Sequence, residues 1–189
     1  MSGNIVPIYP LSDIIAGLSK NIDEFNQYIS GLDKSQFESN VDGKWSAGQN
    51  LDHLIRSTKP LVLAYGLPKF VLKWIYGKAN RPSKNFEALV NKYKLKLLAG
   101  GAASGRFVPA PVAFNQKQKL IKKYDGLKKD LLKKLNHWKE KDLDDYILPH
   151  PLLGKLTLRE MLFFTIHHNE HHLLLLKTRG KMPDKETRA

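Results

Sequence analysis

Four segments of the chain carry apolar residues three and four positions apart, which is the spacing that lines one face of an α-helix. They cover about residues 11–30, 46–66, 114–138 and 157–179. Ser46 with Gln49, and Thr157 with Glu160, have the spacing of capping boxes, which begin helices. Strand-like alternation is almost absent. The pattern therefore predicts an all-α fold, a four-helix bundle with a long crossover between its second and third helices.

Length and composition limit the classes of protein that the chain can belong to. A chain of 189 residues, of which 42% are hydrophobic, is expected to form a single domain over residues 1–189. No segment has the ~20 uninterrupted apolar residues of a bilayer span, so no transmembrane helix is expected. Residues 1–20 lack the features of a signal peptide, which predicts a cytoplasmic protein. Because the chain has no cysteine, any thiol in its chemistry must come from a substrate.

Four of the seven histidines lie within residues 167–172. Residues four apart share a helix face, so His167 with His171, and His168 with His172, are each a potential pair of imidazole ligands for a metal. Apolar periodicity favours the core-facing position for His168 and His172 without settling the choice. A polar turn on a helix surface would explain either pair without a metal.

A third metal ligand would have to come from another helix, and His53 is the candidate. It shares a helix row with Asn50, Ser57 and Ala64, and this row contains no lysine or glutamate. Such short side chains suit a groove beside a metal, and they suit a mildly polar solvent-exposed face equally well.

Three short motifs follow one another along the chain. Residues 45–54 read W-S-A-G-Q-N-L-D-H-L, residues 150–157 read H-P-L-L-G-K-L-T, and residues 168–173 read H-N-E-H-H-L. Together they resemble the signatures of the DinB-like (DinB/YfiT-like metalloenzyme) superfamily. The resemblance implies a four-helix bundle that holds a divalent metal through three histidines, which correspond here to His53, His168 and His172.

The same resemblance carries expectations about activity. Several members of the superfamily are similar to thiol-dependent S-transferases or to a maleylpyruvate isomerase, and homodimers are common among them. His171 corresponds to the neighbouring non-ligand of the last motif, and His167 is an additional histidine. The usual glutamine after this motif is replaced by Leu174 or Leu175, so any role of that glutamine is lost.

Other residues are candidates for supporting the metal ligands or lining a pocket beside them. They are His150, His171, His167, Asn50, Ser57, Asp52, Asn169, Glu170, Tyr65, Trp74 and Tyr76. For His150, in the turn before the last helix, the alternative is a hydrogen bond to the backbone. For the others the alternative is a place in the core or on a helix surface.

These features favour a metal-dependent enzyme, a transferase or hydrolase that acts on a small molecule through a metal-bound thiol or water. Imidazole ligands suit Zn, Ni or Fe, and the sequence does not distinguish these ions. The alternative is a non-catalytic basic binding protein for nucleic acid or an anionic membrane surface, since the net charge is +13 and residues 117–141 contain ten lysines. Nucleic acid is disfavoured, because no recognition motif accompanies the lysines and a solvated helix face explains them.

Overall fold

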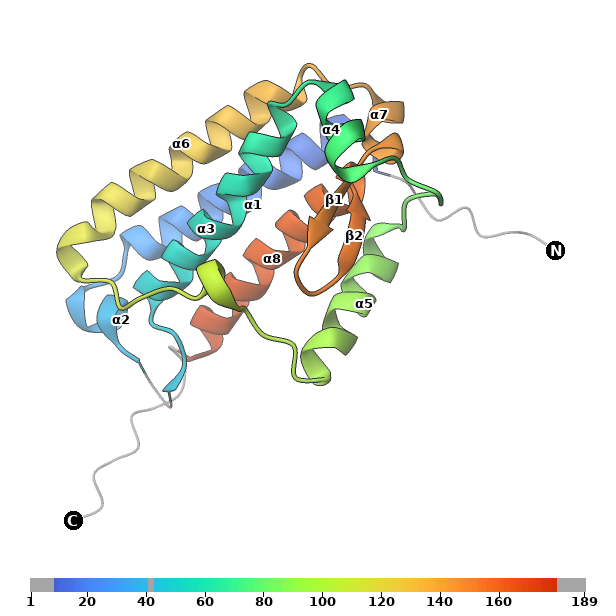
Figure 1. The fold of residues 1–189 in the computed structure, drawn as a ribbon. Helices are drawn as coiled ribbons and strands as arrows, with labels where there is room; N and C mark the ends of the chain where they lie inside the picture. The colour runs from blue at the N-terminus through green and yellow to red at the C-terminus, as the bar shows by residue number, and fades with distance from the viewer. Residues whose placement is uncertain (1–8, 41–42, 180–189) are drawn as a thin grey trace, which may run out of the picture.

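The computed structural model describes residues 9–40 and 43–179, and these residues are mostly helical. The four longest helices are α1 (Leu11–Ser30), α3 (Ala47–Tyr65), α6 (Lys117–Leu135) and α8 (Leu158–Arg179). α1 packs against α6 and α8, and α3 packs against α6 (Figure 1). The ends of these helices lie within three residues of the ends expected from apolar periodicity.

Side-chain capping begins two of the long helices where the sequence predicts it. Ser46 Oγ accepts from the backbone N–H of Gln49 at 3.2 Å, and Gln49 Oε1 accepts from the N–H of Ser46 at 3.0 Å. Thr157 and Glu160 make the same reciprocal pair at the start of α8, at 3.2 and 2.9 Å. Each box satisfies two backbone donors that the first helical turn leaves free, and so fixes the residue at which the helix starts.

The crossover between α3 and α6 contains more helix than loop. Its elements are α4 (Lys69–Tyr76), α5 (Phe86–Leu98) and two 3-10 turns, η2 (Gly105–Phe107) and η3 (Phe114–Gln116). α5 packs against α8, and η2 packs against α3. The crossover therefore closes over the space between α3 and α8.

Two short helices are not expected from the sequence. The loop expected after the first helix contains α2 (Lys34–Glu38), which begins with a capping box between Asp33 and Gln36. The third long helix ends at Leu135 rather than near residue 138 and is followed by α7 (Glu140–Asp145). Between these two helices Trp138 packs inward, where its Nε1 donates to the backbone oxygen of Tyr65 at 3.1 Å.

The fold is mostly helical, as the all-α expectation has it, and it also contains a small two-stranded antiparallel sheet. β1 (Ile147–His150) pairs with β2 (Gly154–Thr157), and His150 lies opposite Gly154 at the turn. Gly154 has φ +77°, a conformation that side chains with a Cβ rarely adopt. The strands are too short to show alternation in the sequence, which is why the sequence predicts only a turn before the last helix.

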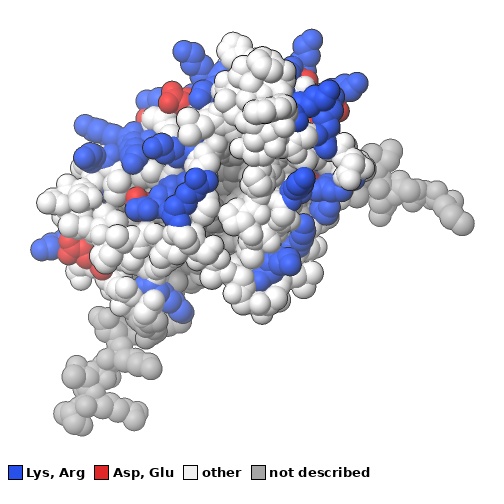
Figure 2. Space-filling view, in the orientation of Figure 1, with Lys and Arg blue, Asp and Glu red and all other residues white. Residues whose placement is uncertain are grey.

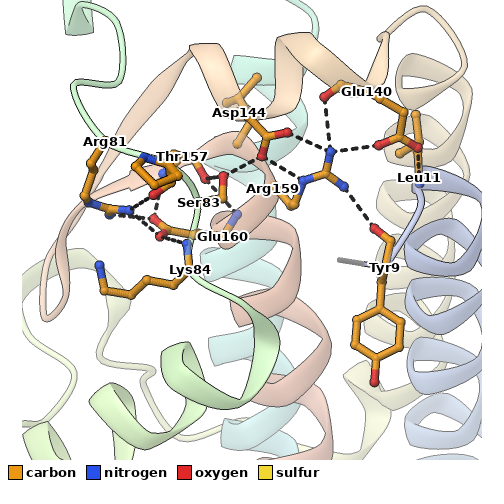
Figure 3. Close-up of polar contacts among 12 residues, drawn as sticks. Tyr9, Leu11, Arg81, Ser83, Lys84, Glu140, Asp144, Thr157, Arg159 and Glu160 are labelled. Carbon is orange, nitrogen blue, oxygen red and sulfur yellow. Dashed lines mark hydrogen bonds and ion pairs between the residues drawn. The ribbon is translucent and has the colours of Figure 1, made fainter. Parts of the chain in front are cut away.

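Glu160 anchors the first turn of α8 although its side chain is fully buried. Its carboxylate accepts from both terminal nitrogens of Arg81, at 2.6 and 2.8 Å, and from the backbone N–H groups of Lys84 and Thr157 (Figure 3). Burial alone would raise the pKa of this carboxyl, but the hydrogen bonds from Arg81, Lys84 and Thr157 hold it below its usual value.

Arg159, the neighbouring residue, ties α8 to segments on the other side of the helix. Its guanidinium donates to Asp144 at 2.8 and 2.9 Å, to Glu140 Oε2 at 2.7 Å and to the backbone oxygen of Tyr9 at 2.9 Å (Figure 3). Three chain segments, residue 9, residues 81–84 and α7, thus converge on the start of α8. Together with Glu160, this residue fixes the helix that carries the histidine cluster.

Candidate metal centre

Three histidine rings from α3 and α8 meet inside the protein. The Nε2 atoms of His53 and His168 are 3.1 Å apart, and those of His168 and His172 are 3.0 Å apart. Two imidazole nitrogens bound to one ion at about 2.0–2.1 Å lie about 2.9 Å apart at right angles and about 3.4 Å apart in a tetrahedron. The observed spacing falls in this range, so the three-histidine group could hold a metal ion.

Two of the rings, His53 and His172, are hydrogen-bonded through Nδ1, on the side away from the cluster. These bonds direct the Nε2 lone pairs of both rings inward. His53 Nδ1 lies 2.8 Å from the backbone oxygen of Phe107, and His172 Nδ1 lies 2.6 Å from Asn50 Oδ1. Both partners only accept, because Asn50 uses its Nδ2 to donate to the oxygens of Trp45 and Ser46 at 3.1 and 2.8 Å. Each ring must therefore carry its hydrogen on Nδ1, which leaves an Nε2 lone pair for a metal.

This donor set fits a cation better than it fits three rings alone. His168 Nε2 faces the lone pairs of both His53 and His172, and a neutral ring can donate one hydrogen to only one of them. Burial lowers the pKa of His168 well below its usual value, and the neighbouring His172 and His53 lower it further. Burial also lowers the pKa of His53. The neutral form that ligates metal is therefore the favoured form of His53 and His168.

The helix registers explain why these three rings meet. His168 and His172 are one turn apart on the buried row of α8, and both are 6% exposed, whereas His53 on α3 is 5% exposed. Trp45 covers the group: its ring lies parallel to that of His172 at 6.5 Å and tilted against that of His53 at 4.9 Å. The row that apolar periodicity favours is thus the buried one.

A cavity of about 690 Å³ gives access to the three rings. Its walls come from α3, α5, residues 102–107, the β1–β2 hairpin and α8, so the crossover and hairpin complete a space that the long helices begin. Figure 2 shows a hollow on the corresponding face, with lysine and arginine side chains on both sides of it. The lining is largely apolar, with Tyr76, Tyr93, Phe107 and Phe164 among its aromatic residues.

The other histidines of the cluster occupy distinct places. His171 lines the cavity, half-buried, with its ring 5.8 Å from that of Tyr93. His167 points elsewhere, since its Nδ1 lies 3.7 Å from Glu170 Oε2 and its ring contacts Phe86. His150 lines the cavity, and its Nδ1 also accepts two hydrogen bonds from the backbone of its own turn.

Asn50 and Ser57, from the short-side-chain row of α3, both line the cavity. Asn50 orients His172, and Ser57 lines the cavity. Three other candidate partners of the rings make different bonds: Asp52 pairs with Arg56 at 2.6 Å, Asn169 accepts from Tyr124 Oη, and Glu170 accepts from Asn21 Nδ2. These bonds fit the alternative interpretation of the three residues, a place in the core or on a helix surface.

The aromatic candidates divide in the same way. Tyr76 lines the cavity, Tyr65 lies in the core with its hydroxyl donating to the oxygen of Leu158 at 2.6 Å, and Trp74 is 86% exposed. Sequence reasoning missed Phe107 and Tyr93. The contribution of Phe107 is a backbone oxygen, which leaves no signal in the sequence, and Tyr93 lies in a lysine-rich helix of weak periodicity.

The comparison with known protein families agrees with this site. The sequence profile of the DinB superfamily, a metal-binding family, matches residues 18–176, and the chain therefore belongs to this superfamily. No curated protein matches the chain. Within the described part of the chain, none of the helices is both long enough and apolar enough to cross a membrane.

Proposed function

We propose that this protein is a metal-dependent enzyme, a transferase or hydrolase that acts on a small molecule through a thiol or water activated at the three-histidine centre. His53, His168 and His172 would hold the ion, which is Zn, Ni or Fe on the preference of imidazole ligands. The observation that carries the proposal is the convergence of three inward-facing Nε2 atoms beside a cavity large enough for a substrate.

The chemistry follows from three neutral ligands and open positions. A divalent ion so bound lowers the pKa of a coordinated water or thiol toward neutrality. The chain's own residues prepare the site: Asn50 and the Phe107 carbonyl keep two rings in the ligating tautomer, and Trp45 covers them. Since the chain has no cysteine, the thiol of a transferase reaction would come from a low-molecular-weight cosubstrate.

The proposal includes the expected architecture, one cytoplasmic domain over residues 1–189 built as a four-helix bundle. The packing of α1 against α6 and α8, and of α3 against α6, supports the bundle part of this proposal.

The basic surface is explained in part by the fold, which weakens the alternative of a nucleic-acid or membrane-binding protein. Lys117 Nζ donates to the oxygens of Ser30 and Leu32 at 3.0 and 2.6 Å, where α1 ends, and Lys134 Nζ donates to the oxygen of Val62 at 2.8 Å. Ammonium groups stabilise the free carbonyls of helix ends. These α6 lysines therefore have a structural role.

A pair of model reactions tests the proposal. Metal-loaded protein is mixed at pH 7 with a small thiol and 1-chloro-2,4-dinitrobenzene, and separately with 4-nitrophenyl acetate, and both are compared with His53→Ala. We expect thioether formation or ester hydrolysis above the uncatalysed rate in the wild type and not in His53→Ala. Equal rates for the two proteins in both reactions would contradict the proposal. His167→Ala, altered on the same helix as two of the ligands but outside the cavity, serves as the control.

A further inference from the structure

The turn that joins β1 to β2 holds the His150 ring in one chemical form. Its Nδ1 accepts two backbone hydrogen bonds, from the N–H groups of Leu152 at 3.2 Å and Leu153 at 3.1 Å. A neutral imidazole whose Nδ1 accepts must carry its hydrogen on Nε2. A hydrogen on Nδ1 would point at the two backbone N–H groups and replace both hydrogen bonds with repulsion. The turn therefore keeps the ring neutral as well as oriented.

The Nε2–H group of His150 is directed at space rather than at protein. No hydrogen bond joins Nε2 to a described residue, and Nε2 is not among their buried unpartnered atoms. Since the ring lines the cavity, this donor is available to a bound molecule. Burial, with the nearby charge of Lys92, lowers the pKa of His150 to about 4, so the ring stays a neutral donor at neutral pH.

The charges around the cavity specify what kind of acceptor the donor would meet. Lys44 and Arg106 are among the lining residues, and the described lining contains no aspartate or glutamate. A cavity with cations and no carboxylate favours an anionic ligand. Phe164 packs against both the His150 ring, at 4.3 Å, and the His168 ring, at 4.8 Å, so the donor lies one aromatic ring away from the candidate metal ligands.

We infer that the cavity binds a small carboxylate-bearing substrate whose carboxylate accepts a hydrogen bond from His150 Nε2–H while its other end reaches the three-histidine centre. Only the contact with the three-histidine centre rests on the proposed function; the hydrogen bond from His150 does not. His150 is then a residue that binds and orients substrate. It determines specificity for acids over neutral analogues of the same length.

Two substitutions test the roles of the two ring nitrogens of His150 separately. In His150→Asn the amide oxygen can replace Nδ1 as the acceptor of the turn, but the cavity donor is lost. In His150→Gln the amide nitrogen can occupy the place of Nε2 and keep a donor. Equal thermal stability of the wild type and His150→Asn would show that the turn is preserved, and His150→Gln retains the donor even if the turn loosens.

The first measurement uses metal-free protein and does not depend on catalysis. Nitrogen-15 correlation spectra of the imidazoles, assigned by the loss of a signal in His150→Asn, report which nitrogen carries hydrogen. We expect a neutral Nε2–H ring at pH 7, whose signal moves saturably on titration with propionate and stays in place with propanol. A ring protonated on Nδ1, or no saturable shift with propionate, would overturn the inference.

The second measurement uses cobalt-loaded protein and two thiols of equal length, 3-mercaptopropionate and 3-mercapto-1-propanol, followed by the thiolate-to-cobalt absorption band. We expect the acid to bind about tenfold or more tightly than the alcohol, with the preference kept in His150→Gln and lost in His150→Asn. Equal preference in the wild type and His150→Asn would overturn the inference. If neither thiol produces a thiolate-to-cobalt absorption band, the proposed activation of a thiol is wrong. The propionate titration then still tests the role of His150.

Discussion

Replacing Glu160 with alanine should cost about 3 to 5 kcal/mol of unfolding free energy, the range for breaking a buried ion pair by removing one partner. The hydrogen bonds of the Glu160 carboxylate explain why the loss of unfolding free energy should fall in this range. Arg81 loses two charge-assisted hydrogen bonds, and the N–H groups of Lys84 and Thr157 lose their acceptor. Arg81 is about one-third exposed, so its charge regains some hydration, and this limits the loss.

Urea unfolding followed by circular dichroism measures this loss, provided that the slope with denaturant stays the same in both proteins. Glu24→Ala is the control, because Glu24 faces Lys20 at 3.9 Å on an exposed surface and should contribute less than about 0.5 kcal/mol. A loss below about 1 kcal/mol for Glu160→Ala would refute the view that the network in Figure 3 anchors α8.

Three further predictions concern the ligands, the packing and the pH dependence of stability. Asn50→Ala removes the acceptor that orients His172, and it should weaken metal affinity about 10- to 100-fold. A competition assay with a chelator measures this affinity, and an unchanged value would contradict the prediction. Gly48→Ala should cost about 1 to 3 kcal/mol in the same urea assay, because the new Cβ would lie 2.7 Å from the Phe37 ring, and a neutral effect would show that this ring moves freely. His150 has a folded pKa of about 4 against 6.5 for the free group, so the unfolded state binds the proton first and stability falls as the pH drops from about 6.5 to 4. The His150→Asn variant should lose up to about 3 kcal/mol less than the wild type over this range, and parallel curves for the two proteins would contradict the assignment.

Much of the scaffold and the histidine group can be predicted from local patterns. Helical periodicity locates the four long helices, and it favours the row of His168 and His172 because these residues continue an apolar face. Capping chemistry locates two helix starts, because Ser46 with Gln49 and Thr157 with Glu160 act over three residues. Such signals survive in the sequence because both partners lie within one or two helical turns.

The features that escape prediction depend on contacts between distant segments. The oxygen of Phe107 comes from the crossover to orient His53, and any residue type could supply it. Arg106 reaches the cavity only because the crossover folds over α3. The β1–β2 hairpin has strands too short for a period-2 signal, although it is what places His150 in the cavity wall.

The central claim is that residues from two distant segments build one metal site, and metal content tests it most directly. Untagged protein, purified without a metal resin, is analysed by plasma mass spectrometry alongside His53→Ala, His172→Ala and the control His167→Ala. We expect about one divalent ion per chain in the wild type and in the control, and loss of that ion in the other two variants. A wild type without metal, or metal retained by both His53→Ala and His172→Ala, would contradict the claim.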